Sequence, residues 1–392
     1  MTNQSIIDLI DKPISGEWGK DPVEEPIIKV IRNTNFTNTG KLDLSNVVER
    51  CIPHQKIIRK SLRNGDIIIE KSGGSPNQPV GRVVYYDQND GDYLFSNFTS
   101  ALRPRKEVFP RYLFYMMFAH HSYNTTLAFQ NKTTGIINLQ LARYLEKTKI
   151  PLPPLETQKR ITAILDKADE LRCNEQKILE KYDQLAQSVF LEMFGDPVTN
   201  PKGWEKGPTI NYCDCIVPGR NKPKSFTGDI PWVTTEDLVY RGTTLDSKKK
   251  ICLSIEESRE AGAKVIPAMS VIMTCVGDLG IVSINQKEMV VNQQLHTFQC
   301  KSSILPLFLM YNLSFQTPYM HKMASNTTVP YLNKTMCNNT PTILPPIVLQ
   351  KRFAEIIIHI ETQKKLTQQS LQKSEELFQS LLQRAFREEL FL

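Results

Sequence analysis

The feature that most constrains the fold of this chain is a long internal repeat. The segment 153–161 (PPLETQKRI) returns 192 residues later as 345–353 (PPIVLQKRF). The alignment continues without a gap to Phe194 and Phe386 and contains 13 identities in 42 positions, more than a chance alignment gives. We therefore predict two tandem halves of nearly equal length.

Each repeated segment is predicted to be a long helix. A Pro pair opens both copies, and neither then contains Gly or Pro for about 40 residues, which favours an uninterrupted helix of about 60 Å. In the first copy, apolar residues follow a spacing of three and four that is typical of a coiled-coil seam. These residues are Ile164, Ala168, Leu171, Ile178, Tyr182, Leu185 and Val189, whereas Lys167, Arg172, Lys177 and Lys181 are expected on a solvated face. The alternative is a helix buried in a globular core.

The segments that precede the helices are of a different kind. Residues 1–150 and 200–342 are rich in Gly, Pro, Asn and Thr and contain short β-like runs. They also echo each other, because 81–83 (GRV) resembles 280–282 (GIV) and 131–134 (NKTT) resembles 325–328 (SNTT). We predict an α+β chain with mixed α/β domains at 1–152 and 196–344, and long helices at 153–195 and 345–392.

Charge and cysteine usage narrow the class of protein. The net charge is +7, but the helical segments 155–195 and 349–392 carry −2 and +1, which leaves +8 in the mixed domains. This excess is compatible with a polyanionic partner. No apolar stretch approaches the roughly 20 residues of a membrane span, and the N-terminus has no secretory pattern. The eight cysteines are expected to be reduced thiols in the cytoplasm, and Cys213 and Cys215 alone make a poor zinc site.

Three motifs carry a resemblance to a known family. The first is 150–155 (IPLPPL) followed by Gln158-Lys159-Arg160-Ile161, and the second is its copy at 344–346 with Gln350-Lys351-Arg352. The third is the connector from 193–197 (MFGDP) to Trp204. Together they make essentially the whole chain resemble the specificity subunit of type I restriction-modification systems. The Gly203-Trp204 pair that opens a family recognition domain has only a loose counterpart in the first half, Gly16-Glu17-Trp18.

The resemblance implies a specific architecture and set of partners. It implies two target-recognition domains, each followed by a conserved helix, with the two helices paired antiparallel as a spacer in a pseudo-two-fold internal repeat. Each domain is expected to read one half of a bipartite double-stranded DNA target. Two methylation subunits are expected to dock on the helices, and restriction subunits to join them in the nuclease complex. No cofactor is expected on this chain, because S-adenosylmethionine, ATP and magnesium are expected on the partner subunits.

Candidate DNA contacts lie in polar, cationic loops. Base edges are read by Arg, Lys, Asn and Gln, whereas phosphate contacts supply salt-dependent affinity. In the first domain the candidates are Lys71, Ser72, Asn77, Gln78, Arg82, Arg103, Arg105 and Lys132. In the second they are Arg220, Asn221, Lys222, Lys224, Asn292, Gln293, Gln294 and Asn326. The competing interpretation of any such loop is an ordinary solvated loop.

No catalytic motif is found in the sequence. It has no Gly-x4-Gly-Lys-Ser/Thr phosphate loop, no Gly-x-Gly-x-x-Gly turn, and no Asn-Pro-Pro-aromatic motif of amino-methyltransferases. His120-His121 adjoins an aromatic run and is expected to be structural, so neither catalytic nor metal-binding residues are assigned. Two alternatives to a DNA-specificity subunit stay open: an enzyme whose centre escapes motif reading, and a coiled-coil scaffold that binds proteins.

Overall fold

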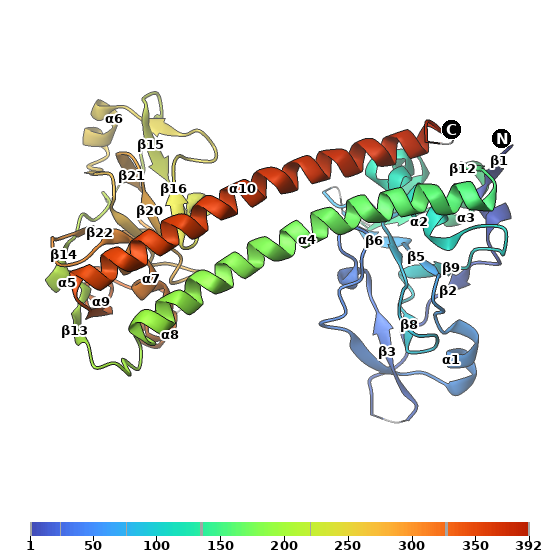
Figure 1. The fold of residues 1–392 in the computed structure, drawn as a ribbon, viewed down its shortest axis with the longest axis horizontal. Coiled ribbons are helices and arrows are strands. Elements are labelled where there is room, and N and C mark those ends of the chain that lie inside the picture. The colour runs from blue at the N-terminus through green and yellow to red at the C-terminus, as the bar shows by residue number, and fades with distance from the viewer. Residues whose placement is uncertain are drawn as a thin grey trace. The chain divides into compact units, whose positions relative to one another are not determined.

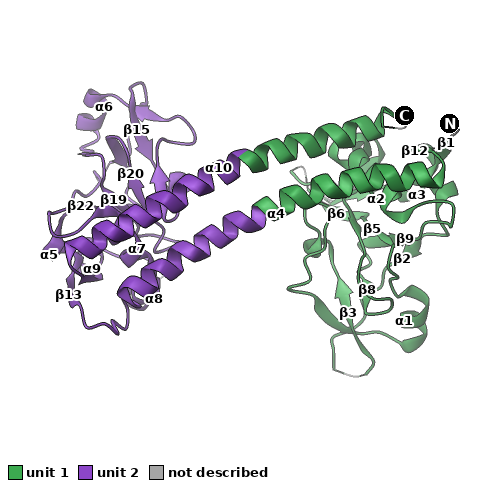
Figure 2. Ribbon diagram, viewed as in Figure 1, with its two compact units in different colours: residues 1–175, 370–392 green, residues 176–369 purple. Residues whose placement is uncertain are grey.

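The chain folds into two compact units, described here from a computed structural model. The structure describes residues 2–23, 25–75, 77–133, 136–219, 221–325 and 328–390, without the side chains of residues 2, 132 and 133. Unit 1 contains residues 1–175 and 370–392, and unit 2 contains residues 176–369 (Figure 2). The division passes through two 40-residue helices, α4 (Leu155–Phe194) and α10 (Ile347–Phe386). The predicted α+β fold with an internal repeat is confirmed, whereas the four domain boundaries stay a prediction.

Unit 1 is built on small sheets and short helices (Figure 1). Its strands are β1 (Thr2–Ser5), β2 (Ile14–Ser15), β3 (Ile27–Ile31), β4 (Val48–Cys51), β5 (Ile67–Glu70), β6 (Ser72–Gly74), β7 (Val83–Tyr85), β8 (Tyr93–Phe95), β9 (Thr99–Leu102), β10 (Gln130–Thr133), β11 (Ile136–Leu139) and β12 (Lys149–Leu152). Its other helices, with η for 3-10 turns, are η1 (Ile6–Leu9), η2 (Asn33–Asn35), α1 (His54–Lys60), α2 (Pro110–Ser122), η3 (Thr125–Phe129) and α3 (Leu141–Lys147). The sheets have the strand orders β2-β9-β5-β7, β4-β3-β8, β10-β11-β6 and β1-β12.

Unit 2 repeats this plan. Its strands are β13 (Glu205–Pro208), β14 (Cys213–Asp214), β15 (Ile230–Val233), β16 (Gly242–Thr244), β17 (Cys252–Leu253), β18 (Val265–Ile266), β19 (Val271–Thr274), β20 (Val282–Asn285), β21 (Met289–Val291), β22 (Leu295–Cys300) and β23 (Pro341–Leu344). Its other helices are α5 (Thr209–Tyr212), η4 (Thr235–Asp237), α6 (Ile255–Glu260), α7 (Pro306–Phe315), α8 (Thr317–Met323) and α9 (Lys334–Asn338). The sheets have the orders β14-β22-β19-β20-β16, β17-β15-β21-β18 and β13-β23.

The central strands of the two units correspond one to one. The order β2-β9-β5-β7 is matched by β14-β22-β19-β20, and the parallel pair β3·β8 is matched by β15·β21. The glycines in the predicted sequence echo occupy equivalent places: Gly81 precedes β7 and Gly280 precedes β20, both at positive φ. A Cβ on Gly81 would meet Thr126 at 3.1 Å, and one on Gly280 would meet Thr317 at 2.3 Å. Both positions therefore need glycine for conformation and for space.

The core of unit 1 includes parts of both long helices. Helix α2 has Pro110 in its first turn, where a missing N–H costs nothing. It is buried along most of its length, and it packs with Ile161 and Leu165 of α4 and with Phe378 and Leu382 of α10. In unit 2 an aromatic cluster has the same role, formed by Phe190, Phe194, Phe308, Tyr311 and Phe353.

The long helices run in opposite directions within each unit. In unit 1 the Ser370 hydroxyl donates to the Glu175 carboxylate, and the Arg172 guanidinium lies 4.0 Å from the ring centroid of Phe378. In unit 2 Lys364 pairs with Asp183 at 2.7 Å, and the rings of Phe190 and Phe353 are 5.4 Å apart. In both cases, residues later in α4 meet residues earlier in α10.

The predicted coiled-coil seam is wrong for four of its seven residues. Ile164, Leu171, Ile178 and Leu185 are 40%, 46%, 41% and 46% exposed. The face of α4 that is buried includes Ile161, Leu165, Ala168, Ala186 and Phe190. Arg172, which was expected on the solvated face, is buried and pairs with Asp169. The packing partners of α4 in each unit select a neighbouring stripe of the same helix.

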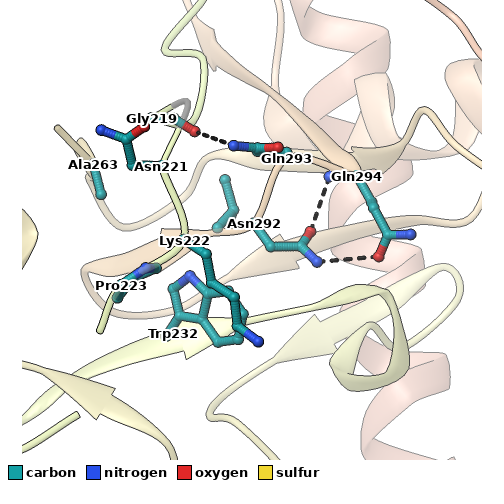
Figure 3. Close-up of a pocket in the computed structure, with 10 residues that line it drawn as sticks. Gly219, Asn221, Lys222, Pro223, Trp232, Ala263, Asn292, Gln293 and Gln294 are labelled. Carbon is teal, nitrogen blue, oxygen red and sulfur yellow. Dashed lines mark hydrogen bonds between the residues drawn. The ribbon is translucent and has the colours of Figure 1, made fainter. Parts of the chain in front are cut away.

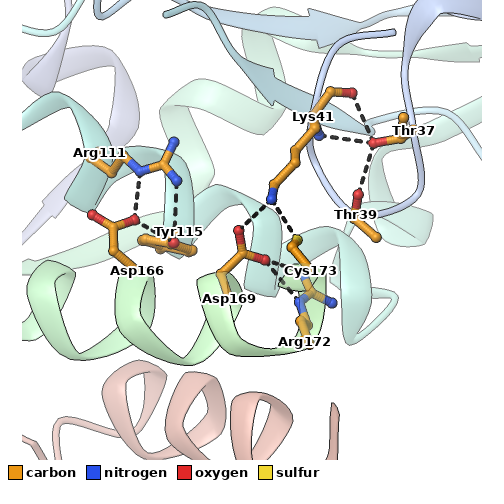
Figure 4. A network of polar contacts seen from close by, with 9 residues as sticks. All are labelled: Thr37, Thr39, Lys41, Arg111, Tyr115, Asp166, Asp169, Arg172 and Cys173. Atoms are coloured by element: carbon orange, nitrogen blue, oxygen red, sulfur yellow. Dashed lines mark hydrogen bonds and ion pairs between the residues drawn. The ribbon is translucent and has the colours of Figure 1, made fainter. Parts of the chain in front are cut away.

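A polar network ties α4 to the rest of unit 1 (Figure 4). Lys41 reaches Asp169 at 2.9 Å and the Cys173 sulfur at 2.6 Å. One turn earlier, Asp166 accepts 2.6 Å hydrogen bonds from Arg111 and from the Tyr115 hydroxyl.

Within the described ranges, no helix combines the length and apolarity that crossing a membrane requires.

Candidate nucleic-acid interface

Five of the predicted DNA contacts lie on one connection in unit 1. Residues 71–82 join β5 to β7, and β6 within this connection pairs with β11 of the β10-β11-β6 sheet. The Lys71 ammonium donates to the Ser15 hydroxyl at 2.9 Å, and the Ser72 hydroxyl donates to the Asn138 side chain at 2.6 Å. Asn77 and Gln78 are exposed at the tip. The same sheet contains Lys132 in β10, although its side chain lies outside the described residues.

Arg82 does not belong with these residues. Its side chain is buried and forms two hydrogen bonds to the Glu70 carboxylate, at 2.9 and 3.1 Å. It also donates to the carbonyls of Phe36 and Asn33. These four bonds hold the connection against β5 and the 33–36 segment. We therefore assign Arg82 a structural role and leave it out of the interface.

Arg103 and Arg105 are not brought together with the 71–78 segment. The pairing of β5 with β9 places Glu70 opposite Thr99 and Ile67 opposite Leu102, so Lys71 and Arg103 follow opposite ends of that strand pair. Arg103 forms two 2.8 Å hydrogen bonds to the buried Asp66, which raise its pKa. Arg105 is exposed and donates to the Ile10 carbonyl at 3.0 Å. Arg103 is therefore also occupied, whereas Arg105 is a separate surface cation.

In unit 2, two predicted segments that are distant in sequence form one pocket. Gly219, residues 221–223 and residues 291–294 line it together with Trp232 and Ala263 (Figure 3). The Gln293 amide donates to the Gly219 carbonyl at 3.2 Å, which ties the two segments together. Asn292 and Gln294 are joined by two 3.1 Å hydrogen bonds. The pocket thus presents amide groups beside an indole, with the exposed Lys222 at its margin.

Glu257 anchors the chain segment that carries Lys222 and Lys224 beside this pocket. Lys224 lies in an adjoining pocket with Asn221, Lys222 and Glu257. The Glu257 carboxylate accepts hydrogen bonds from Thr227 and from the backbone of Ser254. Hydrogen bonds from Ser225 and then from Ser254 and Thr227 lower the pKa of Glu257 to about 2. The carboxylate therefore stays charged and anchors the chain directly after Lys224. Arg220 and Asn326, also predicted contacts, lie outside the described residues.

A turn in unit 1 that we did not predict matches the Asn292–Gln294 turn. Residues 96–98 link β8 to β9 as residues 292–294 link β21 to β22. The Thr99 amide donates to the Ser96 carbonyl at 3.0 Å, and the Leu295 amide donates to the Asn292 carbonyl at 3.1 Å. Asn97 and Phe98 in this turn are exposed. Only the strand topology identifies them, since the sequence Ser-Asn-Phe has no unusual composition.

The loose match of Gly16-Glu17-Trp18 to Gly203-Trp204 is corrected. Trp204 lies directly before β13, which pairs with β23, and the strand that pairs equivalently in unit 1 is β1, with β12. Residues 16–18 instead follow β2, where they line a pocket with Asn97 and Lys56. This place corresponds to the segment after β14 that contains Gly219 and residues 221–223.

The buried histidines His120 and His296 form contacts of a structural kind. His296 lies 3.3 Å from the Cys215 sulfur and 3.0 Å from the Asn338 side chain, and burial lowers its pKa to about 4. Burial also lowers the pKa of His120 to about 4. Across the described part of the chain, no three His, Cys, Asp or Glu residues are grouped as a metal site would need.

Two repeated α+β units with equivalent polar turns define a duplicated recognition protein. The chain belongs to the family of the type I restriction modification DNA specificity domain, whose model matches residues 7–181 and 217–376. The resemblance to type I specificity subunits, inferred from the repeated motifs, is therefore confirmed. DNA target recognition is therefore the chain's general role.

Individual proteins show the same similarity. The MjaX specificity subunit of Methanocaldococcus jannaschii, described as a putative type I restriction enzyme, is 22% identical, with 97% of this chain and 91% of the relative covered. The HindI specificity subunit of Haemophilus influenzae is 20% identical, with coverage of 83% and 88%. A chain solved in a study of assembly and conformational transition of the type I R-M system has a TM-score of 0.58 at 19% identity, with coverage of 98% and 97%. At that identity the last comparison shows a shared fold.

Proposed function

We propose that this chain is the subunit that gives a type I restriction-modification complex its DNA sequence specificity. Each unit reads one half of a bipartite target. The observation that carries the proposal is the equivalence of the two turns, 96–98 and 292–294, on matching strands of the two units. A duplicated reader with different side chains in the same place suits a target made of two different halves. The helices set the gap between the halves.

The proposed DNA contacts are of two kinds. Amides in the turns and loops read base edges: the exposed Asn77, Gln78, Asn221, Gln293 and Gln294 and the half-buried Asn292. Exposed or half-buried cations bind phosphates: Lys71, Arg105, Lys222 and Lys224. Ser72 orients the first loop. Lys132, Arg220 and Asn326 stay in the proposal on the strength of their sequence positions.

The long helices are proposed to bind two methylation subunits, which restriction subunits join in the nuclease complex. The support is a set of exposed apolar residues on α4, Ile164, Leu171, Ile178 and Leu185, which recur every seven residues. Seven residues are two helical turns, so these side chains lie along one stripe. An apolar stripe of this kind on a soluble chain suits a helical partner.

We propose that the chemistry of the complex belongs to these partners. S-adenosylmethionine, ATP and magnesium bind to the methylation and restriction subunits, in the cytoplasm. This chain determines where on DNA the complex binds.

The decisive experiment is co-expression with the methylation subunit, followed by genome-wide mapping of modified adenines. The expected result is a motif of two short specified blocks separated by a fixed unspecified gap. A continuous motif, or sequence-independent binding across a salt series, would contradict the proposal. Turnover of DNA by the purified chain alone with magnesium or S-adenosylmethionine would contradict it as well.

A further inference from the structure

The turn between β8 and β9 is the feature of unit 1 that carries an inference beyond the predicted contacts. We propose that Asn97 and Phe98 are specificity-determining residues that contact base edges in the half of the target read by unit 1. This inference rests on the proposed function and deepens it. It adds a reading element to unit 1 that neither composition nor a motif marks in the sequence.

The first argument is positional. Besides the hydrogen bond that closes each turn, two more are shared. The Ser96 amide donates to the Ile31 carbonyl at the end of β3, at 2.8 Å, as the Asn292 amide donates to the Val233 carbonyl at the end of β15, at 2.9 Å.

The third shared bond comes from the residue after the central strand. The Lys71 amide donates to the Phe98 carbonyl at 2.9 Å, and the Cys275 amide donates to the Gln294 carbonyl at 2.9 Å. These bonds align the turns residue by residue, so that Asn97 matches Gln293 and Phe98 matches Gln294.

The second argument is exposure. Asn97 is exposed, and Phe98 is 44% exposed although residues before and after the turn are buried. A large aromatic side chain at the tip of a three-residue turn adds nothing to the core of unit 1. A Cβ on Gly73, which has φ +95°, would lie 3.8 Å from the Phe98 ring. Gly73 of the 71–78 segment therefore lies beside the Phe98 ring.

The third argument is the charge around the turn. The Lys71 ammonium reaches Ser15, and its pKa is lowered by burial first and by the positive charge of Lys60 second. Lys60 and Lys56 both pair with Glu17. Lys20 and Glu25 line the same pocket as Asn97, Glu17 and Lys56. Four lysines and two carboxylates therefore lie near the turn, which leaves a net positive surface suited to the DNA backbone.

The chemistry of the two side chains indicates the class of ligand. An Asn amide matches the N6 and N7 edge of adenine, and a phenyl ring makes the apolar contact that the methyl group of thymine offers in the major groove. The turn therefore suits at least one A·T pair in the half-target of unit 1.

The test uses the complex of the full chain with its methylation subunit. In Asn97→Ala and Phe98→Ala, the mapped motif should lose about ten-fold in discrimination at one or two positions of one block. The other block and the gap should be unchanged. Asn64→Ala is the matched control, because Asn64 is an exposed asparagine that precedes β5, at the end of the strand away from the turn. The motif mapped with this variant should equal that of the wild type.

A second variant separates base contact from folding. Phe98→Leu keeps an apolar group, so it should retain more discrimination than Phe98→Ala at the same position, with thermal unfolding unchanged in both. DNA carrying deoxyuridine for thymine in that block should weaken the wild-type complex and leave Phe98→Ala unaffected. If both alanine variants keep the wild-type motif, the inference is wrong. A wild-type complex without a split motif would instead overturn the proposed function itself.

Discussion

Gln158 and Gln350, which are 192 residues apart, make the same three hydrogen bonds in the two units. The Gln158 side chain accepts from the Phe109 amide at 2.8 Å and donates to the carbonyls of Glu107 and Pro153 at 3.3 and 2.8 Å. The Gln350 side chain accepts from the Leu305 amide at 2.9 Å and donates to the carbonyls of Ser303 and Pro345 at 3.1 and 2.9 Å. Each glutamine fastens the start of a long helix to the segment that opens α2 or α7.

Replacing either glutamine should destabilise only its own unit. Gln158→Ala leaves a buried amide and two carbonyls without partners, at a cost of about 2 to 4 kcal/mol. Hydrogen exchange should accelerate at Phe109 and not at Leu305, and Gln350→Ala should give the reverse. Gln176→Ala is the control, because Gln176 is also repeated but is exposed. Equal effects of Gln158→Ala in both units would contradict this assignment.

Arg82 should behave as a structural residue. Arg82→Ala leaves the buried Glu70 carboxylate without its cation and should lower the free energy of unfolding by about 3 to 5 kcal/mol. The double variant Arg82→Met with Glu70→Leu should recover part of this loss, since no buried charge remains. Gln78→Ala, at the exposed tip of the same connection, should stay within about 0.5 kcal/mol of the wild type. Chemical denaturation of the three variants would measure the differences.

The stability of unit 2 should fall in acid because of His296. Burial lowers the pKa of His296 to about 4, whereas the unfolded chain takes up the proton near its ordinary value of about 6.5. Above pH 6.5 His296 is neutral in both states and costs no stability; as the pH falls from about 6.5 to about 4 only the unfolded chain binds the proton, so the free energy of unfolding falls by about 3 kcal/mol, and below pH 4 this decline levels off. Denaturation of wild type and His296→Gln across this range should show a shallower decline in the variant. Parallel curves would show that another group is responsible.

The exposed stripe on α4 should matter for assembly and not for folding. Ile178→Glu and Leu185→Glu should reduce co-purification of the methylation subunit by at least about ten-fold, because each puts a charge into the proposed apolar contact. The melting temperature of the isolated chain should not change. Gln176→Glu adds the same charge on an exposed neighbour and serves as the control. Unimpaired assembly of both stripe variants would remove the support for docking on this face.

Phosphate contacts in unit 2 should appear in the salt dependence of DNA binding. Lys222→Ala and Lys224→Ala should each reduce the slope of log K against log salt by about one and weaken binding to all sequences alike. Lys249→Ala is the matched control, because Lys249 is exposed and already paired with Glu236. A variant that relaxes the motif without changing the slope would reassign its lysine to base reading.

The length of the helices could be predicted from the sequence, but not the face that is buried. The lack of Gly and Pro is a local property, and it gave the extent of α4 to within two residues. The second helix was predicted to end at 392, but α10 ends at Phe386, where neither Gly nor Pro marks the end. Ile164 and Leu171 are as apolar as Ile161 and Leu165, so the two stripes overlap in the sequence. Only the position of the partners, α2 and α10 in unit 1, decides which stripe is covered.

The parts of the candidate site that could be predicted are those whose local amino-acid composition is unusual. Three consecutive amides at Asn292–Gln294 are conspicuous, whereas Asn97 and Phe98 become visible only through the equivalence of β8–β9 with β21–β22. Arg82 could not be recognised as buried, since its partner Glu70 is 12 residues away and meets it only because β5 and β7 pair. Long-range strand pairing thus decides which cations remain available to a ligand.

The interrupted makeup of unit 1 has a consequence for the order in which the protein is made. Residues 176–369 are contiguous, so unit 2 can close its core as it leaves the ribosome. Unit 1 needs Phe378, Leu382 and Ala385 for its core, and these are synthesised after all of unit 2. At about 5 to 20 residues per second, the first 175 residues wait roughly 10 to 40 seconds with part of their apolar surface uncovered. The part of the chain that is synthesised first is therefore completed last, and its uncovered apolar surface is of the kind that chaperones bind during synthesis.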